Sequence, residues 1–293
     1  MALTRSDAPT RAERVEHLTE QIATAVERLA DSEEWRAMLR IAARLRRYSL
    51  GNLLLIALQR PTATHVAGYR AWQALGRQVR QGERAIRILA PIVTARPHRD
   101  DTERSEASEP GRRRLVGWTS AAVFDIAQTD GPELPADPVA IDGQVPDGAL
   151  DALTTHADGL GFTVSREAAV GREAFTDFMG RRIVLEADRP DAHTLVSLVH
   201  EIAHILLHDP AHGFDYQGCR GQAEIEAESV AYVVTTALGV ATAEPYSAAY
   251  IAGWAGGDPA KVRDAAERVT RTAAALLDHL DPKADPATTP TPD

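Results

Sequence analysis

The chain has one cysteine, Cys219, among 293 residues, so an intramolecular disulfide and a cysteine-rich zinc cluster are both excluded. It has no run of about 18 apolar residues, so we expect no membrane-spanning helix and no membrane partner. Residues 1–20 are polar and acidic without an apolar centre, which is unlike a signal peptide. These absences favour a soluble protein of the reducing cytoplasm.

Basic residues are scarce in the second half of the sequence. Residues 131–293 contain 11 Lys and Arg against 26 Asp and Glu, a charge of -15, whereas residues 1–130 contain 21 Arg against 16 acids, a charge of +5. Within residues 36–95 there are 11 Arg and one acid, Glu83, which gives +10. This asymmetry suggests domains with different partners, and only the basic segment is a candidate for nucleic-acid binding.

Hydrophobic periodicity indicates an α+β protein of two domains. The expected N-terminal domain, residues 1–130, has helices over 11–29, from the Asp31–Ser32 cap to 45, and over 48–59, and a hairpin of strands 84–93 and 115–126 with a mobile loop at 97–114. A proline-rich linker is expected over 131–147, a second domain over 148–280, and a disordered tail over 281–293. The second domain is expected to contain helices 149–160, 193–208, 223–238, 246–254 and 259–280, and strands 161–164 and 181–185.

The clearest chemical motif is His200-Glu201-Ile202-Ala203-His204 on the helix over 193–208. Histidines at i and i+4 share one face of a helix and can bind one ion, most simply zinc. Glu201 lies beside the first ligand, where a carboxylate can act as the general base for a hydrolytic reaction. A five-residue match can arise by chance, but the apolar, uncharged flanks favour a buried metal site.

The third ligand has to come from elsewhere in the sequence. His208 is eight residues from His200, about 12 Å along a helix, so one ion cannot bind both, and we expect His208 simply to end the helix. Pro210 stands where a metzincin would have its third histidine. The downstream helix therefore supplies the candidates.

Three carboxylates compete on that helix: Glu224, Glu226 and Glu228. Glu224 and Glu228 share a face, and such a pair offers one ligand and one acceptor for the ring N–H of a ligand histidine. Zinc metalloproteases of the thermolysin type show a similar arrangement. We favour Glu224 as the ligand and Glu228 as the orienting acceptor, with Glu226 and Glu228 as alternative ligands.

The basic segment interleaves arginines with aromatic residues, which is typical of single-stranded nucleic-acid binding. The alternative is that the aromatics are buried and the arginines form a solvated face. The candidate DNA-binding residues are Arg46, Arg47, Tyr48, Asn52, Tyr69, Arg70, Trp72, Arg77 and Arg80.

Residues 10–130 resemble the N-terminal domain of ArdC-type antirestriction proteins. The resemblance rests on Tyr48–Ile56, Val66–Trp72, Gly76–Glu83 and Ile86–Pro91, with Val123–Thr129 at its end. It implies binding of single-stranded DNA. The charged insertion at residues 97–114 departs from the family pattern.

Residues 148–280 resemble the ImmA/IrrE metallopeptidases through the two helices that carry His200 to His204 and Glu224 to Ala231. This resemblance implies a zincin-like domain with Glu224 as the third ligand, and a strand near residues 181–185 as an edge for substrate. It therefore implies a zinc endopeptidase attached to a DNA-binding domain, active on an unknown protein in antirestriction or mobile-element transfer. The alternatives are a non-catalytic protein that shields single-stranded DNA and holds a structural metal, and a regulatory protease that cleaves a transcriptional repressor.

Overall fold

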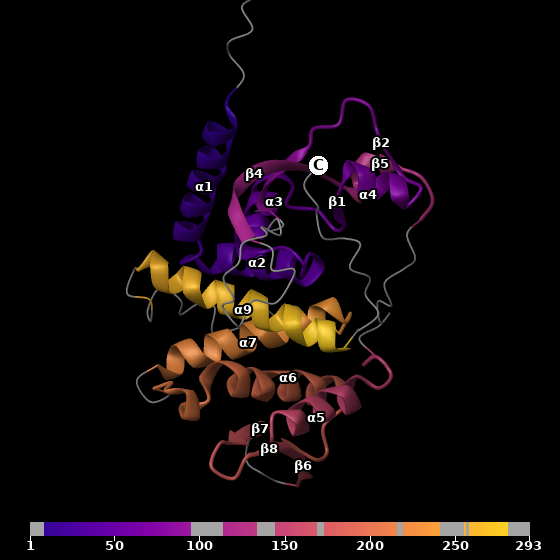
Figure 1. Cartoon of the computed structure of the whole chain (residues 1–293). Coiled ribbons are helices and arrows are strands. Elements are labelled where there is room, and N and C mark those ends of the chain that lie inside the picture. Colours follow the sequence, from indigo (N-terminus) through magenta and orange to yellow (C-terminus); the bar gives the residue numbers. More distant parts are fainter. Residues whose placement is uncertain are drawn as a thin grey trace, which may run out of the picture.

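The computed structural model describes residues 9–94, 114–133, 144–168, 173–215, 219–240, 255 and 258–280. Helices and strands occur in both halves of the chain, which confirms the α+β class (Figure 1). The helices are α1 Arg11–Arg28, α2 Ser32–Arg44, α3 Leu50–Gln59, α4 Tyr69–Ala74, α5 Ala149–Gly159, α6 Asp191–His208, α7 Arg220–Ala237 and α9 Pro259–Leu280, with 3-10 turns η1 Ile126–Gln128 and η3 Pro210–His212. The strands are β1 Val66–Gly68, β2 Gln78–Val79, β3 Ile86–Thr94, β4 Arg114–Asp125, β5 Thr129–Asp130, β6 Thr163–Glu167, β7 Ala174–Asp177 and β8 Arg182–Glu186.

The N-terminal half consists of helices around an antiparallel sheet of order β1-β4-β3. Asp31 caps the N-terminus of α2, as one of the two residues predicted for this role, because its carboxylate accepts hydrogen bonds from the backbone N–H of Glu33 at 2.8 Å and of Glu34 at 3.4 Å. The predicted hairpin is confirmed: β3 and β4 pair antiparallel, with Ile86 opposite Val123. The loop predicted at 97–114, apart from Arg114 at the start of β4, lies outside the described residues, as does most of the linker predicted at 131–147.

The C-terminal half has a three-stranded sheet of order β6-β8-β7, covered by helices. Strand β8 pairs with β6 in parallel and with β7 antiparallel. Both edges of β8 are therefore occupied, so the expectation that residues 181–185 provide a substrate edge is wrong. Strand β7 is the edge strand beside α6. The sequence did not predict it, because its short segment lacks a regular apolar alternation.

Helix boundaries in this half follow the predictions closely. Helix α6 begins at Asp191 after Pro190, two residues before the predicted start, and α7 begins at Arg220, three residues early. Helix α9 has the predicted bounds. The helix predicted at 246–254 and the tail lie outside the described residues. No helix in the described ranges is long and apolar enough to cross a bilayer.

One hydrophobic core runs through both halves. Helix α2 packs directly against α7, and α9 packs against α7 and also contacts α1 and α3. Trp35 is fully buried at this junction, and its indole N–H donates a hydrogen bond of 3.0 Å to the Ser229 hydroxyl. Helix α7, which carries part of the metal motif, is thus packed against the N-terminal half. The domain bounds 1–130, 131–147 and 148–280 stay a prediction.

Candidate metal centre

Helix α6 carries the motif on its most buried turns. Its apolar residues Leu195, Leu198 and Ile202 are at most 1% exposed. Burial of this stripe fixes the rotation of the helix. It brings the His200 and His204 rings together on the adjacent face, with Nε2 atoms 2.9 Å apart. His204 is buried and His200 is half-buried, so the pair is reached from one side.

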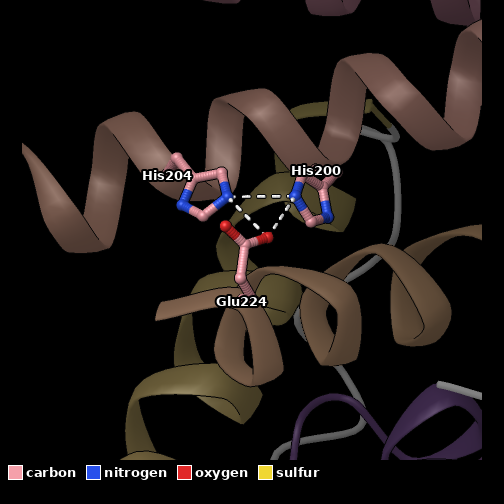
Figure 2. A group of neighbouring side chains, drawn as sticks. All are labelled: His200, His204 and Glu224. Atoms are coloured by element: carbon pink, nitrogen blue, oxygen red, sulfur yellow. Dashed lines mark hydrogen bonds and ion pairs between the residues drawn. The ribbon is translucent and has the colours of Figure 1, made fainter. Parts of the chain in front are cut away.

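Helix α7 supplies a carboxylate to this pair. Oε2 of Glu224 lies 3.4 Å from Nε2 of His200 and 3.6 Å from Nε2 of His204 (Figure 2). Ligand atoms of a tetrahedral zinc ion with bonds of about 2.0–2.1 Å lie about 3.3 Å apart. The three separations, 2.9, 3.4 and 3.6 Å, bracket that value. Two imidazoles and one carboxylate are also a donor set that zinc and other divalent metals accept, so the residues form a possible metal site.

The electrostatics of the cluster attract positive charge. Burial lowers the pKa of the His200 imidazole, but the hydrogen bond to Glu224 and the negative charges of Glu201, Glu224 and Glu228 outweigh burial, so the net pKa is raised. Three carboxylates therefore act on one ring through their negative charge. The same negative charges that favour a proton on that ring would also favour a bound divalent cation.

Glu201 lies beside the triad and does not join it. Its carboxylate is buried, and Oε2 accepts a hydrogen bond of 2.7 Å from the Thr176 hydroxyl on β7. The two residues face the same pocket of about 620 Å³ as the triad; its lining is Ala174, Phe175, Thr176, Phe178, His200, Glu201, His204, Pro210, Phe214, Asp215, Arg220 and Glu224. Thr176 was missed from the sequence, because the short strand that carries it has no clear pattern.

The other two carboxylates of α7 differ from Glu224 in position. Glu228 is half-buried, and its negative charge contributes to the raised pKa of His200. Glu226 is fully buried on another side of α7, where it contacts His208 and Arg268. Among the three carboxylates considered from the sequence, Glu224 is the one that meets both histidines.

His208 ends α6, as expected, and is fully buried. Burial lowers the pKa of its imidazole more than the adjacent Glu226 raises it. Burial alone would raise the pKa of the Glu226 carboxyl, but hydrogen bonds from His208, Arg268 and Gln222 and the charge of Arg268 hold it below its usual value. A neutral histidine thus lies beside an ionised carboxylate in the protein interior.

The predicted DNA-binding residues fall into three groups in the structure. Trp72 and Arg77 are 1% and 9% exposed. Trp72 donates to the Phe124 carbonyl at 2.9 Å, and Arg77 donates to the Thr129 hydroxyl at 2.8 Å. Both side chains therefore form contacts within the fold, and neither is available to DNA as predicted. The alternation of arginine and aromatic residues in the sequence does not reveal which of them a short strand or helix will bury.

A second group lines one pocket. The side chains of Arg46, Arg47, Tyr48 and Asn52 border a pocket of about 660 Å³ between α1, β4 and α9. Tyr48 is mostly buried and donates to the Val66 carbonyl at 2.8 Å, and Asn52 pairs with the backbone of Leu89. Three further lining residues, missed from the sequence because β4 and α9 bring them there, are Trp118, Arg263 and Arg271.

The remaining candidates lie elsewhere on the N-terminal half. Tyr69 and Arg80 border another pocket of about 600 Å³, with Tyr69 40% exposed and in edge-to-face contact with Phe124. Arg80 forms ion pairs with Glu83 at 2.8 Å and with Asp130 at 3.3 Å. Arg70 is exposed at the surface.

The comparison with known proteins bears first on this N-terminal half. Residues 12–124 match the family model described as the N-terminal domain of anti-restriction factor ArdC. This part of the chain is therefore similar to the N-terminal domain of ArdC. The match spans α1 to β4, so it includes the hairpin. It also includes the residues before α9 that line the 660 Å³ pocket, which we call the arginine-lined pocket after Arg46, Arg47, Arg263 and Arg271.

Two solved structures are similar to more of the chain. The metal-free crystal structure of the antirestriction ArdC protein from R388 plasmid has 22% identity and a TM-score of 0.46, and covers 79% of this chain and 84% of its own. The Mn(II)-bound structure of that protein has 20% identity and a TM-score of 0.47, and covers 91% and 97%. No curated protein sequence matches the chain. The metal centre is therefore judged by its own geometry.

Proposed function

We propose that this ArdC-type protein is a zinc-dependent endopeptidase joined to a domain that binds single-stranded DNA, and that it acts in antirestriction or mobile-element transfer. The observation that supports the enzymatic part is the arrangement of His200, His204 and Glu224 around one point, with Glu201 in the same pocket. A site that only stabilised the fold would have no use for a separate carboxylate facing that pocket.

The side chains have distinct roles in this proposal. His200, His204 and Glu224 would hold the ion, which when bound supplies Lewis acidity and a water activated at neutral pH. Glu201 takes a proton from the attacking water and delivers it to the leaving amine. The Thr176 hydroxyl orients this carboxylate through its hydrogen bond to Oε2. Edge strand β7, which borders the pocket, can align an extended peptide.

Glu201→Gln tests the proposal, because it keeps the shape of the side chain and removes the base. Wild type and variant would be loaded with zinc, their metal content measured, and their cleavage of labelled casein compared. Exposed Glu167→Gln on β6 is the matched control. We expect equal metal content in all three, and cleavage lost in Glu201→Gln alone.

Three results would count against this proposal or favour an alternative to it. Cleavage by Glu201→Gln at the wild-type rate would remove Glu201 from the reaction. If wild type cleaves nothing, and Glu201→Gln protects single-stranded DNA from restriction as well as wild type does, the non-catalytic alternative with a structural metal is favoured. Cleavage confined to a repressor protein would instead favour the regulatory protease.

The DNA-binding part is supported by the arginine-lined pocket. Arg46, Arg47, Arg263 and Arg271 border it, and the Trp118 ring beside them is 47% exposed. Arginines supply phosphate contacts and an exposed ring supplies a stacking surface for a base. Two acids, Glu267 and Asp278, also line the pocket, which leaves it with a formal charge of +2 from four arginines and two acids.

A salt series measures this interaction directly. Binding of a labelled oligo-dT would be titrated at several salt concentrations for wild type, Arg47→Ala, Arg271→Ala and the control Arg166→Ala on the distant strand β6. We expect the first two variants to bind more weakly and to have a shallower salt slope by about one unit each. Binding of wild type that does not depend on salt would contradict phosphate contacts.

A further inference from the structure

A continuous line of buried side chains leads away from the candidate metal ligand His204. Its Nδ1 atom lies 3.1 Å from Nδ1 of His208, and Nε2 of His208 lies 3.2 Å from Oε2 of Glu226. Arg268 on α9 donates to both carboxylate oxygens of Glu226, at 2.5 and 3.1 Å, and Gln222 donates to Oε1 at 2.7 Å. The line therefore joins α6, α7 and α9.

The hydrogen-bond capacities of these groups fix a single direction along the line. Nε2 of His204 faces His200 and Glu224, and a nitrogen that binds a metal carries no proton. The proton of a neutral His204 ring is then on Nδ1, which donates to Nδ1 of His208. His208 in turn carries its proton on Nε2 and donates to the Glu226 carboxylate. Each donor meets one acceptor, and the last acceptor is ionised.

Burial shows that this arrangement is built into the interior. His208 and Glu226 are both 0% exposed. An ionised carboxylate is costly in the interior unless it is paired and hydrogen-bonded. Arg268 and Gln222 already pair with this carboxylate and donate hydrogen bonds to it without His208. The contact between α7 and α9 therefore does not explain why a histidine lies between the carboxylate and the ligand ring.

Resting on the proposed metal site, we propose that His208 and Glu226 are positioning residues for His204. They hold its ring in one tautomer and one orientation, with Nε2 directed at the ion. A carboxylate acting on a ligand histidine makes that ring a better donor, and loss of such partners typically lowers metal affinity 10- to 100-fold. Here the carboxylate acts through a second imidazole, and Arg268 of α9 keeps the carboxylate ionised.

The test compares the binding of Co(II), whose visible spectrum reports coordination geometry. His208→Leu has a similar volume and no acceptor. His208→Asn keeps an acceptor near the position of Nδ1. Val269→Ala removes buried packing on α9 and leaves the line intact, so it is the control for a general loss of stability. Chelator competition gives the affinity of each full-length protein, and the unfolding midpoint gives its stability.

We expect His208→Leu to bind Co(II) about 10- to 100-fold more weakly than wild type, with an altered spectrum. His208→Asn should be closer to wild type, and Val269→Ala should keep both affinity and spectrum. Glu226→Gln, a milder change that preserves shape, should weaken binding by a smaller factor. The variant series thus separates positioning from packing.

The proposal is overturned if His208→Leu binds Co(II) with the affinity and spectrum of wild type, or if Val269→Ala loses as much affinity as His208→Leu. The first result would leave the metal site intact and remove the positioning role, so the proposed function would stand. If wild type binds neither Co(II) nor Zn(II), the metal site fails and the positioning proposal fails with it. Wild-type binding is therefore measured first.

Discussion

The buried pair of Glu226 and Arg268 makes a quantitative prediction about stability. In Arg268→Met the guanidinium is lost, and a fully buried carboxylate keeps only Gln222 and His208 as partners. Removing one partner of a buried ion pair costs about 3–5 kcal/mol. The Arg268 side chain is 35% exposed, so water already screens part of the attraction. We expect the free energy of unfolding to fall by about 2–3 kcal/mol after this discount.

Urea unfolding monitored by tryptophan fluorescence measures this loss at neutral pH. The double variant Glu226→Gln/Arg268→Met removes the buried charge as well, so it should be more stable than Arg268→Met alone. Arg263→Met, on the exposed side of α9 with an ion pair to Glu267, is the matched control and should change stability by about 0–1 kcal/mol. A loss below about 1 kcal/mol in Arg268→Met would refute the reasoning from burial.

The same pair predicts a dependence on pH. The pKa of the Glu226 carboxyl is held below its usual value near 4.5 in the folded protein, so its ionised form stabilises the fold at neutral pH. A group with a depressed folded pKa loses this contribution as pH falls from the unfolded pKa through the folded one. The stability difference between wild type and Glu226→Gln should therefore shrink as pH falls below 4.5. A difference that stays constant to lower pH would contradict the assignment of an ionised Glu226.

Three further variants examine single contacts. Thr176→Val removes the donor to the Glu201 carboxylate, the proposed general base, and should lower kcat/KM in the casein assay about tenfold, as expected for about 1.4 kcal/mol. Thr155→Val on the exposed face of α5 should have no effect. Trp35→Phe leaves the buried Ser229 hydroxyl without its donor and should cost about 1–3 kcal/mol of stability in urea unfolding; an unchanged midpoint would count against this contact. Arg77→Ala should destabilise the fold by a similar amount while the affinity for oligo-dT changes less than twofold, and a loss of DNA binding without destabilisation would reverse this assignment.

The elements that follow regular periodicity were predicted well from the sequence. Helix α9 has the predicted bounds, and the hairpin of β3 and β4 lies within two residues of its prediction at each described end. In these segments the spacing of the apolar residues determines both the type of element and which of its faces is buried. Strand β7 was missed because four half-buried residues give no such spacing. Its contribution, the Thr176 hydroxyl, could not be assigned without it.

The carboxylates of α7 illustrate a second limit. Spacing on a helix separates Glu226 from Glu224 and Glu228, since two residues correspond to a rotation of about 200°. It does not say which direction faces α6. The structure directs Glu224 to the two histidines and Glu226 to His208. Glu226 also accepts hydrogen bonds from Arg268, which is 42 residues away in the sequence and is brought to it by the packing of α9.

Helix α9 explains why the metal site and the arginine-lined pocket belong to one unit. Arg268 reaches inward to Glu226, while Arg263 and Arg271 of the same helix border the pocket that Arg47 lines from the N-terminal half. The helix packs against α7 and contacts α1 and α3, and one hydrophobic core includes residues of all four helices. A fragment without α9 would leave a buried carboxylate without its guanidinium and would remove two of the four arginines from the pocket. Both proposed activities therefore have to be measured on the whole chain, because the pocket draws its arginines from both halves and Glu226 keeps its guanidinium only when α9 is present.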